Sequence, residues 1–261
     1  MKKRIFKALA AAVLIIIFCG GAFVYNESTY VLPVLMYHSI DYNDRITKLS
    51  VSPESFEAQM EFLHKKRYNV LTLKEAIAFI MKKKRVPPKT LVITFDDGYY
   101  NNYAYAYPVL KKYKIPATIF VITSKMGEPG FINRKQLREM SDSGLITIGS
   151  HTVNHLWLPD ISPKDLRYEV AESRRILEET LGKGVDTFCY PIGAFDENVK
   201  KTVEESGYIC AVTTNPGWFK RTDDIFAIKR IKITRSSDNL FIFWAKTTGL
   251  YTWYKERRGN E

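Results

Sequence analysis

Five acidic or imidazole side chains directly follow short apolar segments of the sequence: His38, Asp96, Asp97, His151 and His155. Adjacent carboxylates after a buried strand are unfavourable unless a cation or a shared proton lies between them. One aspartate and two histidines can bind a divalent metal ion and leave positions open for water and substrate. The other aspartate is then free to accept a proton from a metal-bound water. The pattern predicts metal-dependent hydrolytic chemistry.

Each of these signals also has a purely structural interpretation. An aspartate in a turn often accepts hydrogen bonds from backbone amides, and a His-x-x-x-His spacing also arises by chance. The joint placement of the five residues after neighbouring predicted strands favours the metal site. The remaining histidine, His64, lies in a predicted helix beside Lys65 and Lys66, and we expect it to be exposed.

The elements that position these groups alternate between short apolar runs and amphipathic helices. Predicted strands cover residues 31–37, 68–71, 91–95, 117–121, 145–149, 187–190, 208–213 and 227–233. One predicted helix starts at Pro53 with Ser52 as its N-cap, and further predicted helices cover residues 72–83, 103–113, 133–143, 162–181, 197–206 and 238–247. This alternation predicts an α/β fold with a parallel sheet and outer helices, and the number of units favours a distorted (β/α)7 TIM-like barrel over an open sheet.

The N-terminal residues differ in composition from the rest of the chain. Residues 1–7 carry four cations and no acid, and residues 8–25 are apolar. As a helix that run spans ~27 Å, close to the thickness of a bilayer core. It stays apolar through Tyr25, which favours an uncleaved membrane anchor over a cleaved signal peptide. We expect residues 1–25 to be a basic flank with an anchor or signal segment. Residues 26–261 would form one catalytic domain outside the cytoplasm at the cell membrane.

Charge and cysteine content exclude two further classes of protein. The net charge is +11, but the basic residues are scattered, and no stripe of basic and aromatic residues indicates nucleic-acid binding. Three cysteines are too few for a disulfide framework. We expect Cys189 and Cys210, which lie on predicted strands, to be buried and free, and the chain to be monomeric.

Two motifs resemble those of a known family. The stretch TFDDGYYNNYAYAYPVLKKYKIPATIFV (94–121) and SHTVNH (150–155) resemble the polysaccharide deacetylases of carbohydrate esterase family four. The resemblance runs from about residue 33 to residue 233 and implies a distorted barrel of about seven β–α units. It also implies that Asp96 is the general base. The implied metal ligands are Asp97, His151 and His155, which would bind Zn²⁺ or another divalent ion such as Co²⁺ or Ni²⁺.

Two departures from the commonest family pattern favour the branch that includes the biofilm poly-N-acetylglucosamine deacetylases. Many members have an arginine two residues before Pro191, whereas this chain has Cys189 there. The usual Leu-x-His near the C-terminus is missing, and His38 is the expected substitute that protonates the departing amine. The alternative to this role is that His38 is a buried structural histidine.

A loop and a basic residue are the expected substrate-binding elements: Tyr190, Pro191, Gly193 and Arg230. A backbone N–H of the loop could help to hold an oxyanion, or the loop could only shape the barrel. Arg230 could bind substrate, orient Asp96 or another carboxylate, or be an ordinary surface cation.

The resemblance implies a hydrolase that removes N-acetyl groups from an extracytoplasmic polysaccharide of amino sugars, such as poly-N-acetylglucosamine, peptidoglycan or a chitin-like polymer. The alternatives are a metal-dependent O-acetyl esterase that acts on xylan or a wall polymer, and a non-catalytic wall-binding module. The expected partners are the polysaccharide and, through residues 1–25, the membrane.

Overall fold

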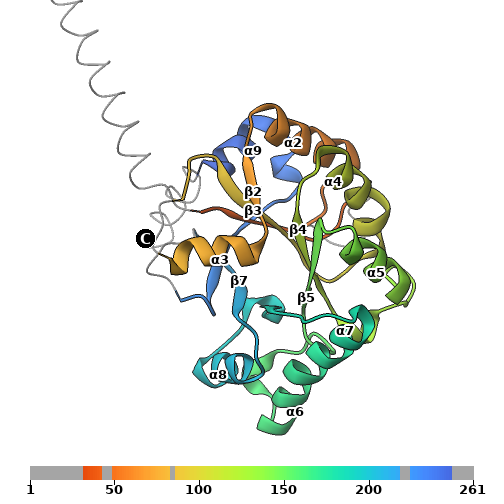
Figure 1. The fold of residues 1–261 in the computed structure, drawn as a ribbon, viewed down its shortest axis with the longest axis vertical. Helices are drawn as coiled ribbons and strands as arrows, with labels where there is room; N and C mark the ends of the chain where they lie inside the picture. The colour runs from red at the N-terminus through yellow and green to blue at the C-terminus, as the bar shows by residue number, and fades with distance from the viewer. Residues whose placement is uncertain (1–31, 43–48, 83–85, 218–223, 249–261) are drawn as a thin grey trace, which may run out of the picture.

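A closed ring of parallel strands forms the centre of the protein (Figure 1). The computed structural model describes residues 32–42, 49–82, 86–217 and 224–248. Its strands are β1 (Val34–Tyr37), β2 (Asn69–Leu71), β3 (Thr90–Phe95), β4 (Ala117–Val121), β5 (Ile146–Ser150), β6 (Thr187–Cys189), β7 (Cys210–Pro216) and β8 (Ile228–Lys232). Seven of them close into a barrel through the β1–β3 pairing, and β2 pairs beside β3. The predicted (β/α)7 barrel is confirmed in this part of the chain.

The barrel is irregular where β5 pairs with β6 and where β7 pairs with β8. Only one register pair, Ser150 with Phe188, joins β5 to β6. The pairing of β7 with β8 shifts between Val212 and Pro216. Such irregularities commonly re-aim side chains at the rim of a barrel.

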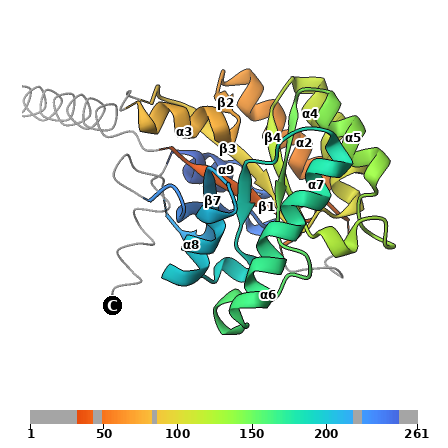
Figure 2. The same ribbon diagram turned by 60° about the horizontal axis from the view of Figure 1, so that its bottom comes forward.

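Helices surround the outside of the sheet (Figures 1 and 2). They are α2 (Pro53–Lys65), α3 (Leu73–Met81), α4 (Tyr107–Tyr113), α5 (Arg134–Asp142), α6 (Pro163–Arg167), α7 (Ser173–Leu181), α8 (Glu197–Glu205) and α9 (Leu240–Thr247). Ser52 caps α2, and Thr72 and Glu75 form a capping box at α3. The single helix expected over 162–181 is instead α6, a π-helical turn η4 (Tyr168–Glu172) and α7. A second π-helical turn, η1 (Asn102–Ala106), precedes α4.

Alternate strand residues fill two separate cores. On β3, Leu91, Ile93 and Phe95 belong to the outer cluster beneath the helices, whereas Val92 belongs to the cluster inside the barrel. The inner cluster also contains buried residues of α3, so α3 closes the end of the barrel at which the strands begin. Because side chains alternate along a strand, the polar residue Thr94 also faces the interior.

Several smaller expectations concern single residues. Cys189 and Cys210 are buried and free, and His64 is exposed, which confirms those predictions. Among the described residues, no helix has the length and apolar character needed to cross a membrane. The predicted anchor, with its cysteine, lies outside the described residues.

Candidate active site

The three predicted metal ligands converge at the carboxyl ends of β3 and β5. Asp97 Oδ1 lies 3.5 Å from His151 Nε2 and 3.8 Å from His155 Nε2. One ligand atom from each residue lies within 4.8 Å of the others. Ligand atoms bound ~2.1 Å from a tetrahedral zinc ion lie ~3.4 Å apart. The three side chains therefore fit one divalent cation with little movement.

The His151 ring is held in the orientation that a metal ligand requires. Its Nδ1 lies 2.8 Å from the carbonyl oxygen of Cys189, and since a carbonyl only accepts, Nδ1–H is the donor. The unprotonated Nε2 then faces Asp97. Burial lowers the pKa of His151 to about 3, and burial also lowers the pKa of His155. Both rings are thus neutral at physiological pH, the form that binds metals.

Among the described residues, no lysine or arginine forms an ion pair with Asp97, although the charge of Arg230 partly lowers its pKa. Burial raises its pKa to about 7, with the neighbouring Asp96 as the second cause. Its backbone has φ 73°, a left-handed conformation that turns the carboxylate away from the strand. A divalent ion would stabilise the ionised carboxylate, so the charge at this point also fits a metal.

The loop between the two histidines is fixed by local hydrogen bonds. Thr152 and His155 both have positive φ, at 66° and 59°. The Thr152 hydroxyl accepts a bond from the His155 N–H at 2.9 Å, and the Ser150 hydroxyl accepts one from the Thr152 N–H at 3.2 Å. These contacts make Ser150 and Thr152 orienting groups for the loop.

A buried carboxylate that sequence reasoning missed also holds this loop. Glu169, in the π-helical turn η4, is 1% exposed. Its Oε2 accepts the backbone N–H of Val153 at 3.0 Å and that of Asn154 at 2.8 Å, and its Oε1 accepts the Asn154 amide at 2.7 Å. The available signal was an acid on the apolar face of the helix, beside Leu166 and Val170. Glu169 therefore positions the loop that carries both imidazoles.

Asp96 forms a buried ion pair with Arg230. Arg230 Nη1 and Nη2 each donate a bond of 2.7 Å to one carboxylate oxygen of Asp96. Arg230 also donates to the Thr94 hydroxyl at 3.0 Å and to the Thr213 carbonyl at 2.8 Å. Burial by itself would raise the pKa of Asp96, but the guanidinium outweighs it and holds that pKa well below its ordinary value. Asp96 is therefore a fixed, ionised carboxylate.

The position of Arg230 differs from the expected contact with substrate. Its side chain is 0% exposed, because strand β8 directs it into the barrel interior. Its donors are used by Asp96 and its neighbours, which leaves no surface for a polymer. The geometry favours the alternative in which Arg230 orients Asp96, and it rules out an ordinary surface cation.

His38 lies beside Asp96, near the same carboxylate oxygen that Arg230 Nη2 contacts. Its Nε2 is 3.9 Å from Asp96 Oδ2, and its side chain is 11% exposed. Within the described part of the chain, its Nδ1 has no hydrogen-bond partner. Burial lowers the pKa of His38, and the Asp96 charge partly opposes that shift. The structure thus brings His38 to the same centre as the predicted base.

The loop after β6 is shaped by Tyr190. The Tyr190 ring is fully buried and stacks on Phe195 with centroids 4.8 Å apart, and its hydroxyl donates to the Phe226 carbonyl at 3.0 Å. Its side chain therefore supports the loop and differs from the expected substrate contact. Pro191 and Gly193 are also buried. Ile192, which the sequence did not single out, has φ 57° and is 60% exposed.

A second group of potential metal ligands overlaps this site. Asp96, His151 and Cys189 also offer atoms within 4.8 Å of one another. Both oxygens of Asp96 are already bonded to Arg230, and burial raises the pKa of the Cys189 thiol well above its ordinary value. A protonated thiol and an occupied carboxylate are poor ligands, so we assign one metal position only.

Together, the parallel barrel and the acidic and imidazole groups at its carboxyl ends are the framework of an α/β-barrel hydrolase. A family model described as polysaccharide deacetylase matches residues 83–211. The putative polysaccharide deacetylase YxkH of Bacillus subtilis is 38% identical over 214 residues, which cover 82% of this chain and 75% of that protein. This chain belongs to the polysaccharide deacetylase family.

Two further similarities concern proteins with a more specific description. The poly-beta-1,6-N-acetyl-D-glucosamine N-deacetylase of Staphylococcus aureus is 34% identical over 175 residues, which cover 62% of this chain and 60% of that protein. The structure of the Streptococcus pyogenes deacetylase PplD, in complex with acetate, has a TM-score of 0.76 at 29% identity. That similarity covers 82% of this chain and 98% of PplD.

Proposed function

We propose that the protein is a metal-dependent N-deacetylase that releases acetate from an extracytoplasmic polysaccharide of N-acetylated amino sugars. The observation that carries the proposal is the ionised Asp96 beside the convergent ligands Asp97, His151 and His155. The polymer named for the S. aureus relative, poly-β-1,6-N-acetyl-D-glucosamine, is the favoured substrate. Peptidoglycan and chitin-like polymers present the same N-acetyl group. When bound, a divalent ion, zinc by expectation, supplies Lewis-acid polarisation of the acetyl carbonyl and of water.

The roles of the protein side chains follow from their charge and position. Asp96 is ionised at neutral pH and accepts the proton of the attacking water. Arg230 keeps its two oxygens fixed. Asp96 passes this proton to His38, whose Nε2 lies 3.9 Å from Asp96 Oδ2, and His38 delivers it to the amine nitrogen as the C–N bond breaks. The second proton of the water leaves the acetic acid on ionisation and is taken up by the released amine. The products are therefore acetate and the ammonium form of the amino sugar.

The direct test measures acetate release by the zinc-loaded chain from poly-β-1,6-N-acetylglucosamine, peptidoglycan and chitin oligomers. His38→Ala should lower the rate by ~10²–10⁴-fold, the usual effect of losing one proton transfer. The matched control His64→Ala, at an exposed and distant histidine, should keep the wild-type rate. A wild-type rate in His38→Ala would remove the acid role.

Other outcomes would point to different functions. Acetate release from acetylated xylan alone would indicate an O-acetyl esterase. An absence of both metal binding and acetate release would indicate a wall-binding module. We further propose that the chain is a single-pass protein of the cell membrane, with the barrel outside the cytoplasm, because residues 8–25 form an apolar run after a basic flank. Fractionation of cells that express the full chain tests this location.

A further inference from the structure

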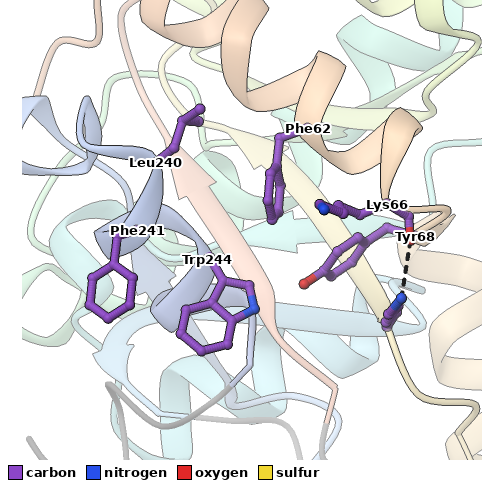
Figure 3. Close-up of a pocket in the computed structure, with 7 residues that line it drawn as sticks. Phe62, Lys66, Tyr68, Leu240, Phe241 and Trp244 are labelled. Atoms are coloured by element: carbon purple, nitrogen blue, oxygen red, sulfur yellow. Dashed lines mark hydrogen bonds between the residues drawn. The ribbon is translucent and has the colours of Figure 1, made fainter.

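An aromatic groove lies on the outer side of the barrel between α9 and α2, and it reaches Lys89 at the amino end of β3. Its volume is about 500 Å³, and it runs between α9 on one side and the end of α2 and the start of β2 on the other (Figure 3). The lining residues are Phe62, Lys66, Tyr68, Lys89, Leu240, Phe241 and Trp244. Figure 3 shows Phe241 and Trp244 on α9, with Phe62 and Tyr68 across from Trp244.

The α9 side of the groove exposes apolar surface that the fold leaves uncovered. Phe241 is 70% exposed, Leu240 40% and Trp244 37%. The opposite face of α9 is packed, since Phe243 and Thr247 are buried. The rings of Phe241 and Trp244 contact each other with centroids 5.4 Å apart. A contiguous apolar surface of this kind, bordered by charged residues, marks an interaction site.

The polar groups in the groove indicate the chemistry of its partner. Two lysines, Lys66 and Lys89, are the charged residues of the lining, which contains no carboxylate or carboxamide side chain. The Tyr68 hydroxyl is already bonded to Thr247 at 2.9 Å. A glycan needs several donors and acceptors for its hydroxyl groups, and this groove offers few. Exposed Phe, Leu and Trp with adjacent lysines instead match the interface of an anionic lipid bilayer.

The strand register places the Lys89 side of the groove near the start of β1, the first strand of the barrel. Lys89 lies just before β3, and its carbonyl accepts the Asn69 N–H at 2.8 Å. Three residues further along, the Val92 N–H donates to the Pro33 carbonyl at 3.0 Å, at the start of β1. Residues 26–32, between Pro33 and the predicted anchor, can span at most ~25 Å. A retained anchor therefore keeps this barrel end close to the bilayer.

The same strand separates the groove from the catalytic centre. Asp96 follows Lys89 by seven residues along β3, which corresponds to ~23 Å of strand. A surface that holds the Lys89 end against a bilayer would therefore direct the Asp96 end outward. In that orientation the site faces the extracytoplasmic polymer.

We propose that the α9 face and its groove form a membrane-docking surface. Leu240, Phe241 and Trp244 enter the headgroup region of an anionic bilayer, and Lys66 and Lys89 contact lipid phosphates. The proposal rests on the proposed membrane location. Its consequence is a fixed orientation of the barrel, with the active site pointing away from the lipid.

The experiment uses the full chain reconstituted in vesicles of phosphatidylglycerol and phosphatidylcholine. Phe241→Cys carries an environment-sensitive fluorophore, in a background in which Cys19 is replaced by Ser. Cys189 and Cys210 are 0% exposed and do not react with the label. The control is the same label at Trp157→Cys, which is 48% exposed in the native protein and follows the metal-ligand loop. The label at 241 should shift to the blue and be quenched by nitroxide lipids, and the label at 157 should do neither.

Charge reversal and activity measurements distinguish a wrong docking surface from a wrong membrane location and from a wrong proposed function. Lys66→Glu with Lys89→Glu should reduce the quenching at 241 in anionic vesicles, whereas Lys164→Glu on α6 should not. Vesicle flotation with an unquenched label at 241 overturns the docking surface. A blue shift without lipid quenching also overturns it, because protein then covers the groove. Loss of flotation overturns the membrane location itself. Acetate release from soluble oligomers, measured on the same samples, tests the proposed function independently.

Discussion

The buried pair of Asp96 and Arg230 makes a quantitative prediction about stability. Asp96→Asn removes the charge opposite a guanidinium that is 0% exposed and donates two bonds of 2.7 Å to it. Removing one partner of a buried ion pair costs ~3–5 kcal/mol. Asparagine can still accept one of the two bonds, so we expect a loss of about 3 kcal/mol. Arg230→Met should cost a similar amount because it leaves a buried carboxylate without its cation.

The double variant with Asp96→Asn and Arg230→Met should recover most of that loss. This variant contains neither buried charge. Replacing both members of a buried ion pair by uncharged groups often changes the free energy of unfolding little. We therefore expect a free energy of unfolding within about 1 kcal/mol of the wild type. Urea unfolding of the four proteins, in detergent with saturating zinc, completes a double-mutant cycle. The double variant should be folded and inactive, which separates the catalytic role of Asp96 from its role in stability.

Two results would refute this reasoning. One is an Asp96→Asn variant that unfolds at the wild-type urea concentration, which would mean that the guanidinium does not need the carboxylate. The other is a double variant whose loss equals the sum of the two single losses, since independent sites add. Full acetate release in Asp96→Asn would overturn the assignment of the base.

Three further predictions concern the metal and the barrel core. Glu169→Ala frees the loop N–H groups and should weaken metal binding by ~10–100-fold in chelator competition, whereas Glu172→Ala on the same π-helical turn should not. The pKa of Asp97 is raised to about 7, so a metal ion that binds below pH 7 must displace the proton of this carboxyl group. The affinity of the site for the metal should therefore rise ~tenfold per pH unit up to pH 7 and then level off. A metal affinity that does not change with pH would contradict this. In Gly149→Ala the added Cβ would lie 2.5 Å from the Phe120 ring and 2.6 Å from the Thr187 hydroxyl, so thermal unfolding should show a loss of ~1–3 kcal/mol. A wild-type unfolding temperature would contradict this.

The fold could be predicted from the sequence to the level of the barrel because its signals are local. Alternating apolar runs and capped helices identify each β–α unit, and every predicted strand in the described part of the chain is present. The interrupted helix over 162–181 could not be predicted in the same way. The buried positions around the π-helical turn keep the spacing of an ordinary helix, at Leu166, Glu169, Val170, Ser173 and Leu177. The pattern therefore does not reveal the turn, which places Glu169 against the metal-ligand loop.

The site residues that directly follow a strand could be predicted from the sequence. Asp96 and Asp97 are adjacent, and His151 and His155 lie four residues apart. The structure brings Asp97 and the two histidines together as this spacing indicates. Arg230 and Tyr190 were harder to interpret, because their roles depend on whether a strand directs a side chain inward. Burial at 0% for both side chains is a property of the closed barrel and cannot be deduced from either residue alone.

The base and the metal ligands of the site are held by different parts of the barrel. The charge that fixes Asp96 comes from the interior, through Arg230 on β8, where packing from all sides holds the guanidinium in place. The metal ligands come from loops, where Asp97 and His155 adopt left-handed backbone conformations that cost energy and persist only with support. Glu169 and the Thr152 hydroxyl give that support. Changes in the interior should therefore alter the base and global stability together, whereas changes around the loops should alter metal affinity with a smaller effect on unfolding.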